Sequence, residues 1–300
     1  MMRIVLLGDI HLYRLAIWPW DLLSKRVLGQ MNLWFHRRHR FHIPGLPSLI
    51  EHVDSIGPDL LLGTGDLTTT ATRAEFRLVV EKLGPLFARY DTVLVPGNHD
   101  RYTFTSTRRR YFEQAMNVDT VRHEPLYRRL GDHLHLVGLD ATRPNLITDR
   151  GHLDPIALMR LGEIIEPMTA SDRVIVMCHY PIAMPPGRAP EAKRHALIDA
   201  ASLAEAMAGC AAQVLYLHGH VHEPQCWRHT EADNLTIINA GAPLMRSAYF
   251  PHGQGFWQID IEPGTAADPA LRHHVVDDAG GWRADAVAWP RRCGEVSSIV

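Results

Sequence analysis

The hexapeptide Val95-Pro96-Gly97-Asn98-His99-Asp100 decides how the rest of the chain is interpreted. It continues the apolar run 92–95, which predicts a buried parallel strand. Proline and glycine end that strand and place an amide, an imidazole and a carboxylate at its carboxyl end. Open α/β sheets bind their ligands at such strand ends, although three polar residues in a row also fit a plain turn. The other strands of the chain must therefore decide between the two interpretations.

Four further apolar runs end in the same manner. The run 3–7 leads into Gly8-Asp9-Ile10-His11, and the run 59–62 leads to Gly65-Asp66. Two later runs lead into motifs that contain His179 and the pair His220 and His222. The carboxyl ends of parallel strands meet at one edge of a sheet. We therefore expect seven side chains of metal-ligand type to converge there: Asp9, His11, Asp66, Asn98, His179, His220 and His222.

These seven side chains are oxygen and imidazole donors without a thiolate. Such a set favours Mn, Fe, Zn, Co or Ni over Ca or a sulfur-bound structural zinc. Seven donors exceed the needs of one ion, so two ions that share a bridging carboxylate are the economical arrangement. Each residue also has an ordinary alternative, since Asp9 and Asp66 fit caps or turns and His179 fits a core histidine. Their joint occurrence at five strand ends favours the dinuclear site.

The five blocks resemble, in the same order, the signature blocks of the calcineurin-like metallophosphoesterase superfamily, over residues 3–222. The resemblance implies an α/β fold, a four-layer α/β/β/α sandwich with two mixed sheets. It implies one ion held by Asp9, His11, Asp66 and His222. It implies a second ion held by Asp66, Asn98, His179 and His220. Thr69 departs from the pattern, because many members carry Asp or Asn there, and this departure concerns the surroundings of the ligands rather than the ligands themselves.

The chemistry expected of such a site is hydrolysis of a phosphodiester or pyrophosphate bond. A hydroxide that bridges two divalent ions is a nucleophile near neutral pH, and the ions neutralise charge on the phosphoryl oxygens. The resemblance suggests that His99 protonates the leaving oxygen or stabilises the transition state. Asp100 would then orient His99 and raise its proton affinity, while a local turn cap is the alternative role of Asp100.

The composition limits the remaining function classes. The chain has 300 residues, of which 46% are hydrophobic, and a net charge of -2, so it can form a sizeable core and gives no reason to expect nucleic acid as a partner. Its four cysteines are widely spaced, so neither a disulfide framework nor a thiolate zinc site is predicted. No run approaches the roughly 18–20 apolar residues of a membrane-spanning helix, and the amino terminus lacks the pattern of a signal peptide. We therefore expect a cytoplasmic protein.

Predicted strands and helices alternate along most of the chain. The patterns predict helices over residues 20–36, 47–56, 72–89, 105–116, 155–168 and 202–208. They predict strands over residues 3–7, 59–62, 92–95, 133–139, 173–177, 214–217, 235–238, 255–261 and 273–276. Thr72-Arg73-Ala74-Glu75 has the pattern of a capping box, and Asp154 that of a helix cap. We expect one domain over residues 1–284, with a helical insert at 12–45 and a C-terminal tail at 285–300.

The insert is the main guide to the substrate. Five of its apolar residues share one face of a predicted helix: Leu23, Val27, Met31, Trp34 and Phe35. Tryptophans precede this face and the basic run 36–40 follows it, a pattern typical of an interfacial helix that contacts a membrane through residues 17–40. A helix packed on the domain core, with a solvated basic end, is the alternative.

The insert and the stretch 65–70 also resemble bacterial enzymes that cleave the pyrophosphate of UDP-2,3-diacylglucosamine, which implies a lipid substrate at the inner face of the membrane. The rival is a soluble cyclic-nucleotide or general phosphodiesterase that uses the same ion pair. A non-catalytic scaffold on the same fold is a third class, and the retention of all seven donors and His99 argues against it. The expected partners are a phosphoester or nucleotide-linked small molecule, lipids included, and two divalent ions, with Mn favoured. The oligomeric state is left open.

Overall fold

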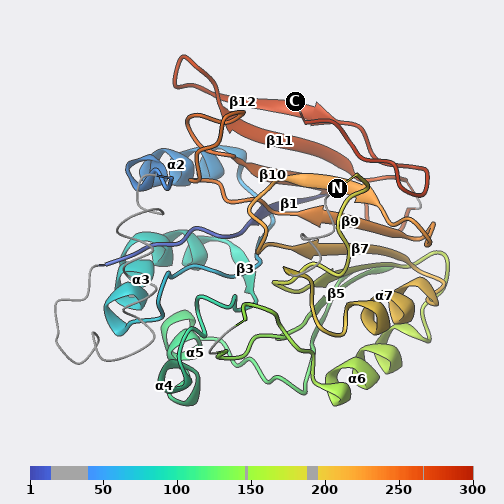
Figure 1. The fold of residues 1–300 in the computed structure, drawn as a ribbon. Helices are drawn as coiled ribbons and strands as arrows, with labels where there is room; N and C mark the ends of the chain where they lie inside the picture. The colour runs from blue at the N-terminus through green and yellow to red at the C-terminus, as the bar shows by residue number, and fades with distance from the viewer. Residues whose placement is uncertain (15–39, 146–147, 188–194, 266, 300) are drawn as a thin grey trace.

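The computed structural model describes residues 1–14, 40–145, 148–187, 195–265 and 267–299. Its first sheet has six strands in the order β12-β11-β10-β1-β2-β3 (Figure 1). The strands β1, β2 and β3 run parallel, whereas β10, β11 and β12 pair antiparallel, with β10 beside β1. The bounds of these strands are β1 (Met2–Leu7), β2 (Leu60–Gly63), β3 (Asp91–Leu94), β10 (Phe256–Ile261), β11 (Ala270–Val276) and β12 (Trp282–Val287).

The second sheet also has six strands, in the order β4-β5-β6-β7-β9-β8. Its four central strands run parallel, and an antiparallel strand closes each edge. The bounds are β4 (Leu126–Gly131), β5 (Leu134–Gly138), β6 (Arg173–Met177), β7 (Gln213–His218), β8 (Gln225–Arg228) and β9 (Leu235–Asn239). Both sheets are therefore mixed, as predicted.

The two sheets pack face to face, and helices cover the outer face of each (Figure 1). Alternate residues of β1 show this division, since Ile4 and Leu6 pack with Ile175 of the second sheet, whereas Val5 and Leu7 pack toward helices. The helices on the first sheet are α2 (Leu46–Ile56), α3 (Arg73–Arg89) and α5 (Tyr111–Met116), and those on the second are α6 (Pro155–Ile165) and α7 (Ala200–Ala208). Two short helices are η3 (Ile43–Gly45) and α4 (Phe104–Arg108). The predicted four-layer α/β/β/α sandwich is confirmed.

Two helices begin where the sequence predicts them. The hydroxyl of Thr72 accepts a hydrogen bond from the backbone N–H of Glu75 at 3.1 Å, and the Glu75 carboxylate accepts one from the N–H of Thr72 at 3.0 Å. Asp154 accepts from the N–H of Ile156 at 2.9 Å and begins α6. Both caps satisfy donors that the first turn of a helix leaves unpaired.

One predicted helix is wrong. Residues 105–116 form parts of two helices, α4 and α5, because Arg110 between them has a left-handed backbone with φ of 52°. Three strands were not predicted: β4 and β12 are partly exposed edge strands with charged residues, and β8 has only four residues. The helix predicted over residues 20–36 lies outside the described residues. Within the described part of the chain, no helix is long and apolar enough to cross a membrane.

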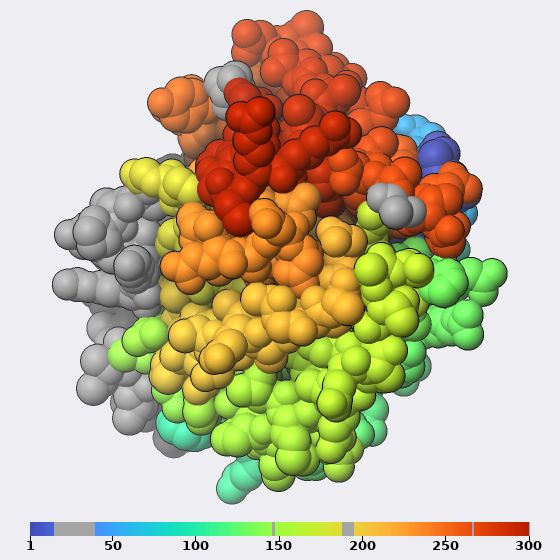
Figure 2. Space-filling model, turned by 90° about the vertical axis from the view of Figure 1, so that its right-hand side faces the viewer, coloured from blue at the N-terminus to red at the C-terminus, as the bar shows by residue number. Residues whose placement is uncertain are grey.

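The segment expected as a tail contacts the second sheet. The Arg228 guanidinium of β8 donates to the carbonyl oxygen of Pro290, and the N–H of Ser297 donates to the carbonyl oxygen of Cys226 at 2.9 Å. Trp227 and Val296 form an isolated antiparallel bridge. In Figure 2 the red C-terminal residues lie directly against the orange surface of this region. The domain limits at residues 1–284 remain a prediction.

The five strand ends come from two sheets rather than from the one sheet that the strand pattern suggested. Strands β1, β2 and β3 supply three of them, and β6 and β7 supply the other two. The backbone N–H of His220 donates to Asp9 across the sheet interface at 3.1 Å, and Nδ1 of His179 lies 2.8 Å from the carbonyl oxygen of Thr64. The ends of the parallel strands of both sheets therefore meet at one place.

Candidate metal centre

The loops that follow these strands are unusually tight. Nine non-glycine residues in the described ranges have a positive φ, and five of them are predicted ligands: Asp9, His11, Asp66, His220 and His222. A left-handed backbone costs energy for residues other than glycine and concentrates at functional sites. Backbone hydrogen bonds hold two of the loops together, from the N–H of Asp9 to Gly65 at 3.0 Å and from the N–H of His11 to Asp66 at 2.9 Å.

Two glycines permit the close approach of these loops. A Cβ atom at Gly97 would lie 2.1 Å from Oδ1 of Asp66, and one at Gly219 would lie 2.3 Å from Oδ2 of Asp9. Such distances are impossible without moving the carboxylates. The glycines that precede Asn98 and His220 in the sequence therefore make room for the predicted ligands.

The first group of donors consists of Asp9, His11, Asp66 and His222, whose candidate ligand atoms all lie within 4.8 Å of one another. Nε2 of His222 lies 3.0 Å from Nε2 of His11 and 3.3 Å from Oδ1 of Asp9. Nε2 of His11 lies 3.6 Å from Oδ2 of Asp66. All but His222 are fully buried, so the group offers converging donors in a protected place.

The second group forms around Asn98. Its amide oxygen lies 2.9 Å from Nε2 of His179 and 2.9 Å from Nδ1 of His220. Oδ2 of Asp66 lies 3.4 Å from the same Nε2 of His179, so this carboxylate faces both groups. The structure thus brings all seven predicted ligands together, and Asp66 occupies the shared position.

The second group contains a conflict that a cation resolves. Nδ1 of His179 lies 2.8 Å from the carbonyl oxygen of Thr64, which can only accept, so this nitrogen carries a proton. In a neutral ring, the lone pair of Nε2 then points toward two further acceptors, the oxygens of Asn98 and Asp66. Buried acceptors that face one another are unfavourable. Either a second proton on His179 or a metal ion supplies the missing positive charge.

The pKa values show the same demand for positive charge. Burial raises the pKa of Asp66, but the charges of His179, His99 and His11 outweigh burial and hold this pKa well below its usual range. Burial lowers the pKa of His179, but Asp66 and Asp9 raise it to about 9. A metal ion therefore competes with a proton on His179, and its affinity falls as the pH falls. The donors fit two divalent ions.

His99 lies beside the first group. Its backbone N–H donates to Oδ1 of Asp66 at 2.7 Å, and its Nδ1 lies 2.6 Å from the carbonyl oxygen of Thr69. The His99 ring meets His11 edge to face at 4.9 Å and stacks on Tyr102 at 5.6 Å between ring centroids. Nδ1 is bonded to a carbonyl oxygen, so proton transfer at this ring goes through Nε2.

Asp100 does not have the predicted role. Its buried carboxylate accepts hydrogen bonds from the backbone N–H groups of Gly97, Leu67 and Thr68 at 3.0 to 3.3 Å, and from the Thr68 hydroxyl at 3.0 Å. The prediction that Asp100 orients the His99 ring is therefore wrong, because the Thr69 carbonyl holds that ring. Asp100 caps its own turn and ties it to the loop after β2, which is the alternative that the sequence left open. Burial and the charge of Asp66 raise the pKa of Asp100 to about 6.

Two further polar residues lie beside the centre and were not predicted. Nδ1 of His195 lies 2.9 Å from Oδ2 of Asp149, and the same Oδ2 lies 3.7 Å from Nε2 of His220. These two residues are 46 positions apart and belong to no motif, so only the folded chain brings them together.

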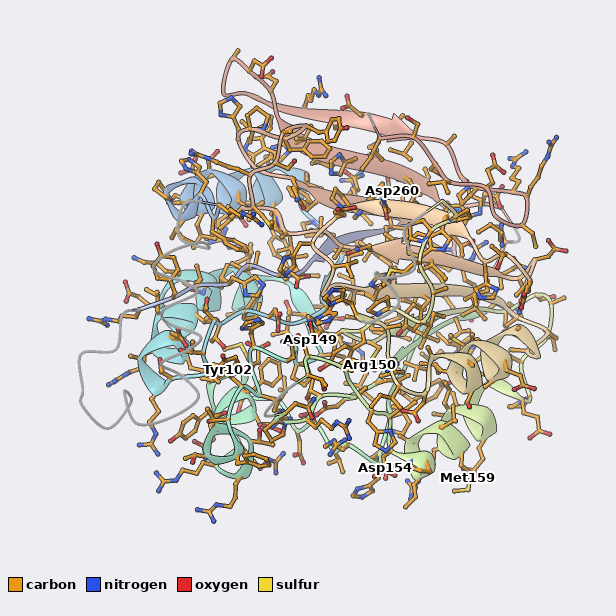
Figure 3. All side chains as sticks on the ribbon, in the orientation of Figure 1. Tyr102, Asp149, Arg150, Asp154, Met159 and Asp260 are labelled. Carbon is orange, nitrogen blue, oxygen red and sulfur yellow. The ribbon has the colours of Figure 1, made fainter. Side chains whose placement is uncertain are left out.

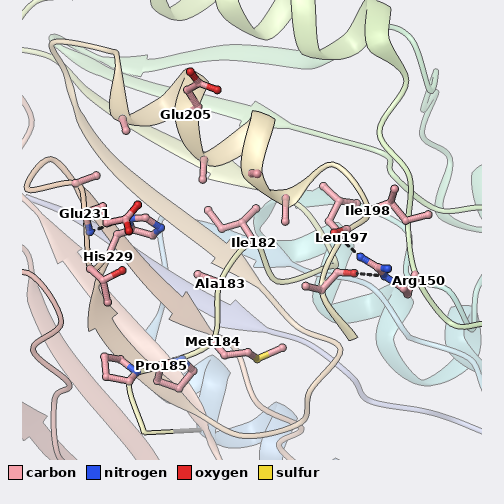
Figure 4. Close-up of a pocket in the computed structure, with 18 of the residues that line it drawn as sticks. Arg150, Ile182, Ala183, Met184, Pro185, Leu197, Ile198, Glu205, His229 and Glu231 are labelled. Atoms are coloured by element: carbon pink, nitrogen blue, oxygen red, sulfur yellow. Dashed lines mark hydrogen bonds between the residues drawn. The ribbon is translucent and has the colours of Figure 1, made fainter. Parts of the chain in front are cut away.

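A cavity of about 960 Å³ is lined by Arg150 and Ala196, which follow Asp149 and His195 in the chain. Its wall is largely apolar and includes Ile182, Met184, Leu197, Ile198 and several alanines of α7. Figure 4 shows the Arg150 guanidinium at one end, bonded to two carbonyl oxygens, and His229 and Glu231 at the other end. The cavity is large enough for a drug-sized organic ligand.

Comparisons with known proteins agree with this geometry. The family model for calcineurin-like phosphoesterases matches residues 2–224. A dimetal phosphatase of Danio rerio has 13% sequence identity and a TM-score of 0.63, over 90% of this chain and 95% of that chain. The purple acid phosphatase PPD1 of yellow lupin, Lupinus luteus, has 12% identity and a TM-score of 0.60, over 97% of this chain and 54% of that chain. The two solved structures show the fold that this chain shares. No curated protein sequence matches the chain.

Proposed function

The chain belongs to the calcineurin-like phosphoesterase family and is a metal-dependent hydrolase of phosphoric ester bonds, and we propose that it cleaves a phosphodiester or pyrophosphate bond at a dinuclear centre. The observation that carries this proposal is the position of Asp66, whose carboxylate faces both donor groups. A carboxylate shared by two ions is the arrangement that in-line displacement at phosphorus uses.

The donors divide between the two ions as follows. Asp9, His11, Asp66 and His222 would hold the first ion, and Asp66, Asn98, His179 and His220 would hold the second. When bound, two divalent ions supply neutralisation of phosphoryl charge and activation of water. The donors carry no sulfur, so the candidates are Mn, Fe, Zn, Co and Ni, of which we propose Mn.

His99 is the proposed proton donor to the leaving oxygen. Its Nδ1 bond to the Thr69 carbonyl fixes the ring, and its backbone bond to Asp66 places it next to the shared carboxylate. A positioned imidazole contributes roughly a hundredfold to ten-thousandfold in rate.

The cavity beside Asp149 supports a substrate with a bulky apolar group. Its largely apolar lining and its volume of about 960 Å³ suit an acyl chain or a similar group attached to the phosphate. We propose a lipid-linked nucleotide of the UDP-2,3-diacylglucosamine type as the substrate, cleaved at a membrane surface. The membrane contact predicted for residues 17–40 lies outside the described residues.

A substrate panel tests the proposal. Metal-reconstituted protein would be assayed on bis-p-nitrophenyl phosphate, p-nitrophenyl phosphate, cyclic AMP and UDP-2,3-diacylglucosamine, with and without chelator. We expect the lipid to be the best substrate and chelator to abolish all turnover. Full activity in chelator would contradict the dinuclear centre, and preference for cyclic AMP would support the soluble phosphodiesterase instead.

A pair of α7 variants tests the part played by the cavity. Ala201 lines the cavity, whereas the neighbouring Ser202 is exposed and does not line it. Ala201→Trp is expected to lower turnover of the lipid substrate about tenfold and to leave bis-p-nitrophenyl phosphate unaffected, because only the lipid needs the cavity volume. Ser202→Trp is the matched control. Equal effects of both variants on the lipid would exclude this cavity as the lipid site.

A further inference from the structure

His220 presents its two ring nitrogens to different surroundings. Nδ1 faces the amide oxygen of Asn98 at 2.9 Å, inside the second donor group. Nε2 points away from Asn98, is buried, and forms no hydrogen bond with any described residue. A buried nitrogen without a partner costs about 1 to 3 kcal/mol, so this atom calls for an explanation.

Asp149 and His195 lie where that nitrogen points. Oδ2 of Asp149 is 3.7 Å from Nε2 of His220, and the rings of His195 and His220 have centroids 5.7 Å apart. Asp149 and His195 also bind each other, since Nδ1 of His195 lies 2.9 Å from Oδ2 of Asp149. Figure 3 shows Asp149 near the middle of the molecule, next to Arg150.

The two loops that carry this pair are joined to each other. The side chain of Arg150 donates from Nε to the carbonyl oxygen of Ala196 at 2.9 Å, and the N–H of Ile198 donates to the carbonyl oxygen of Gly151 at 3.0 Å. The amide of Asn145 donates to the carbonyl oxygen of Arg150 at 2.8 Å. These hydrogen bonds hold the residue that follows Asp149 and tie its loop to the loop of His195.

The chemistry of imidazole links these observations. A histidine that gives the lone pair of Nδ1 to a metal ion carries its proton on Nε2. Metal-binding histidines usually donate this other N–H to a carboxylate, a carbonyl or water, and loss of that acceptor typically weakens metal affinity 10- to 100-fold. Asp149 is the carboxylate nearest to this nitrogen among the described residues.

A third cation is the competing explanation, because Asp149, His195 and His220 offer donor atoms within 4.8 Å of one another. This site would require His220 to bind an ion through each nitrogen and so to lose both ring protons. It would also break the hydrogen bond between Asp149 and His195. Both costs favour a hydrogen-bonded pair over an ion.

We propose that Asp149, oriented by His195, accepts the Nε2–H of His220 and thereby sets the affinity of the second ion. This inference rests on the proposed dinuclear function. Asp149 is a positioning residue, since it acts through His220 rather than on the substrate. Its side chain is 45% exposed, and we expect the 3.7 Å separation to shorten to hydrogen-bond distance when the second ion is bound.

Titration with Mn²⁺, followed by calorimetry and by elemental analysis, tests the proposal on the full chain. Asp149→Ala is expected to lower the affinity for one of the two ions 10- to 100-fold and to leave the affinity for the other unchanged. Activity is expected to return at high Mn²⁺ concentration. Asp149→Asn, which keeps an oxygen acceptor, is expected to have a smaller effect. His195→Ala is expected to lower the affinity for the same ion severalfold, because it removes the N–H donor that orients Asp149.

Two matched controls come from the opposite side of the molecule. His133 has the same geometry as His195, since its Nδ1 lies 2.9 Å from Asp172 and its side chain is 51% exposed against 50% for His195. Asp91 is 49% exposed and pairs with Arg128 at the start of β3. His133→Ala and Asp91→Ala are expected to bind both ions with unchanged affinity.

The outcomes distinguish the inference from its premise. If the wild-type chain binds two ions and Asp149→Ala lowers the affinity for both of them or for neither, the inference is overturned while the dinuclear function stands. If the wild-type chain binds three ions and Asp149→Ala loses one, the pair is a cation site and the inference is overturned. If the wild-type chain binds fewer than two ions, the dinuclear function fails, and the inference fails with it.

Discussion

The two halves of the metal centre differ in how their side chains are oriented, although left-handed turns and backbone hydrogen bonds between loops occur in both. On the side of the first sheet, the loops after β1 and β2 carry Asp9, His11 and Asp66, and the carboxylates of both aspartates accept hydrogen bonds from backbone N–H groups. On the side of the second sheet, the rings of His179 and His220 extend into the site, and contacts of their outer nitrogens orient them.

This difference predicts unequal behaviour of the two ions. Three of the four ligands proposed for the first ion come from the first sheet, so this ion would meet ligands that have little freedom to lose. Donors that depend on side-chain contacts respond to substitutions farther away, such as those at Asp149 and His195. The second ion should therefore be the weaker and the more easily perturbed of the two.

Asp66 carries the shared carboxylate, and its loss should remove the difference in affinity between the two ions. Asp66→Asn is expected to lose both ions and to lower turnover of bis-p-nitrophenyl phosphate by roughly a thousandfold, since the ions supply several kcal/mol of transition-state stabilisation. Metal content and initial rates provide the measurement. Asp132→Asn, at a side chain that is 87% exposed, is the control. Retention of both ions in Asp66→Asn would refute the bridging position of this residue.

Substitution of His99 is expected to lower catalysis without affecting metal binding. His99→Ala should lower kcat by about a hundredfold to ten-thousandfold while both ions remain, because it removes the proton donor and no ligand. Asp9→Asn should instead lose the first ion. The exposed His123 supplies the control His123→Ala. The assignment is wrong if His99→Ala loses both ions while Asp9→Asn retains them.

Asp100 lies in the half of the centre on the side of the first sheet. Its substitution tests how much the stability of this half depends on one carboxylate. Asp100→Ala leaves three backbone N–H groups without their acceptor, so we expect the free energy of unfolding to fall by about 3 kcal/mol. Denaturant unfolding gives the measurement, with Asp119→Ala, at a 78% exposed side chain, as control. A shifted pH–rate profile with unchanged stability would instead restore the role of orienting His99.

The titration of Glu75 gives the smallest expected effect on stability, and this residue also lies on the side of the first sheet. It is buried, accepts hydrogen bonds from Thr70 and Thr72, and burial raises its pKa from 4.5 to about 7. Between these pH values the unfolded chain releases this proton and the folded chain keeps it, so stability falls as the pH rises, by about 1 kcal/mol per pH unit.

The measurement compares metal-saturated wild type with Glu75→Gln by denaturant unfolding at pH 5, 6 and 7. The difference between the two proteins should change steadily across this window, because other titrating groups affect both alike. A constant difference would show that Glu75 does not titrate there.

The sequence predicted the parts of the centre that local patterns encode. Each of the seven candidate ligands follows a buried strand, and glycines such as Gly97 and Gly219 mark where loops approach a carboxylate. The pairing of Asp149 with His195 has no such signature, because it arises from contact between two loops that are distant in the sequence. Edge strand β4 was missed for a related reason, since its exposed and charged residues lack an apolar period.

The role of Asp100 shows the limit of motif interpretation. A carboxylate next to a histidine in the sequence suggests a pair, yet the turn directs Asp100 toward the backbone of residues 67 and 68. The Thr69 carbonyl takes its place at His99. Which neighbour a side chain contacts in a tight turn depends on the backbone path, and the motif does not specify that path.

A crystal of the chain equilibrated with Mn²⁺, measured for anomalous scattering at the manganese edge, tests the central claim most directly. The account predicts two peaks about 3.5–4 Å apart, with the Asp66 carboxylate between them and His220 bound through Nδ1 to the peak on the Asn98 side. A single peak, or two peaks that do not share Asp66, would contradict it.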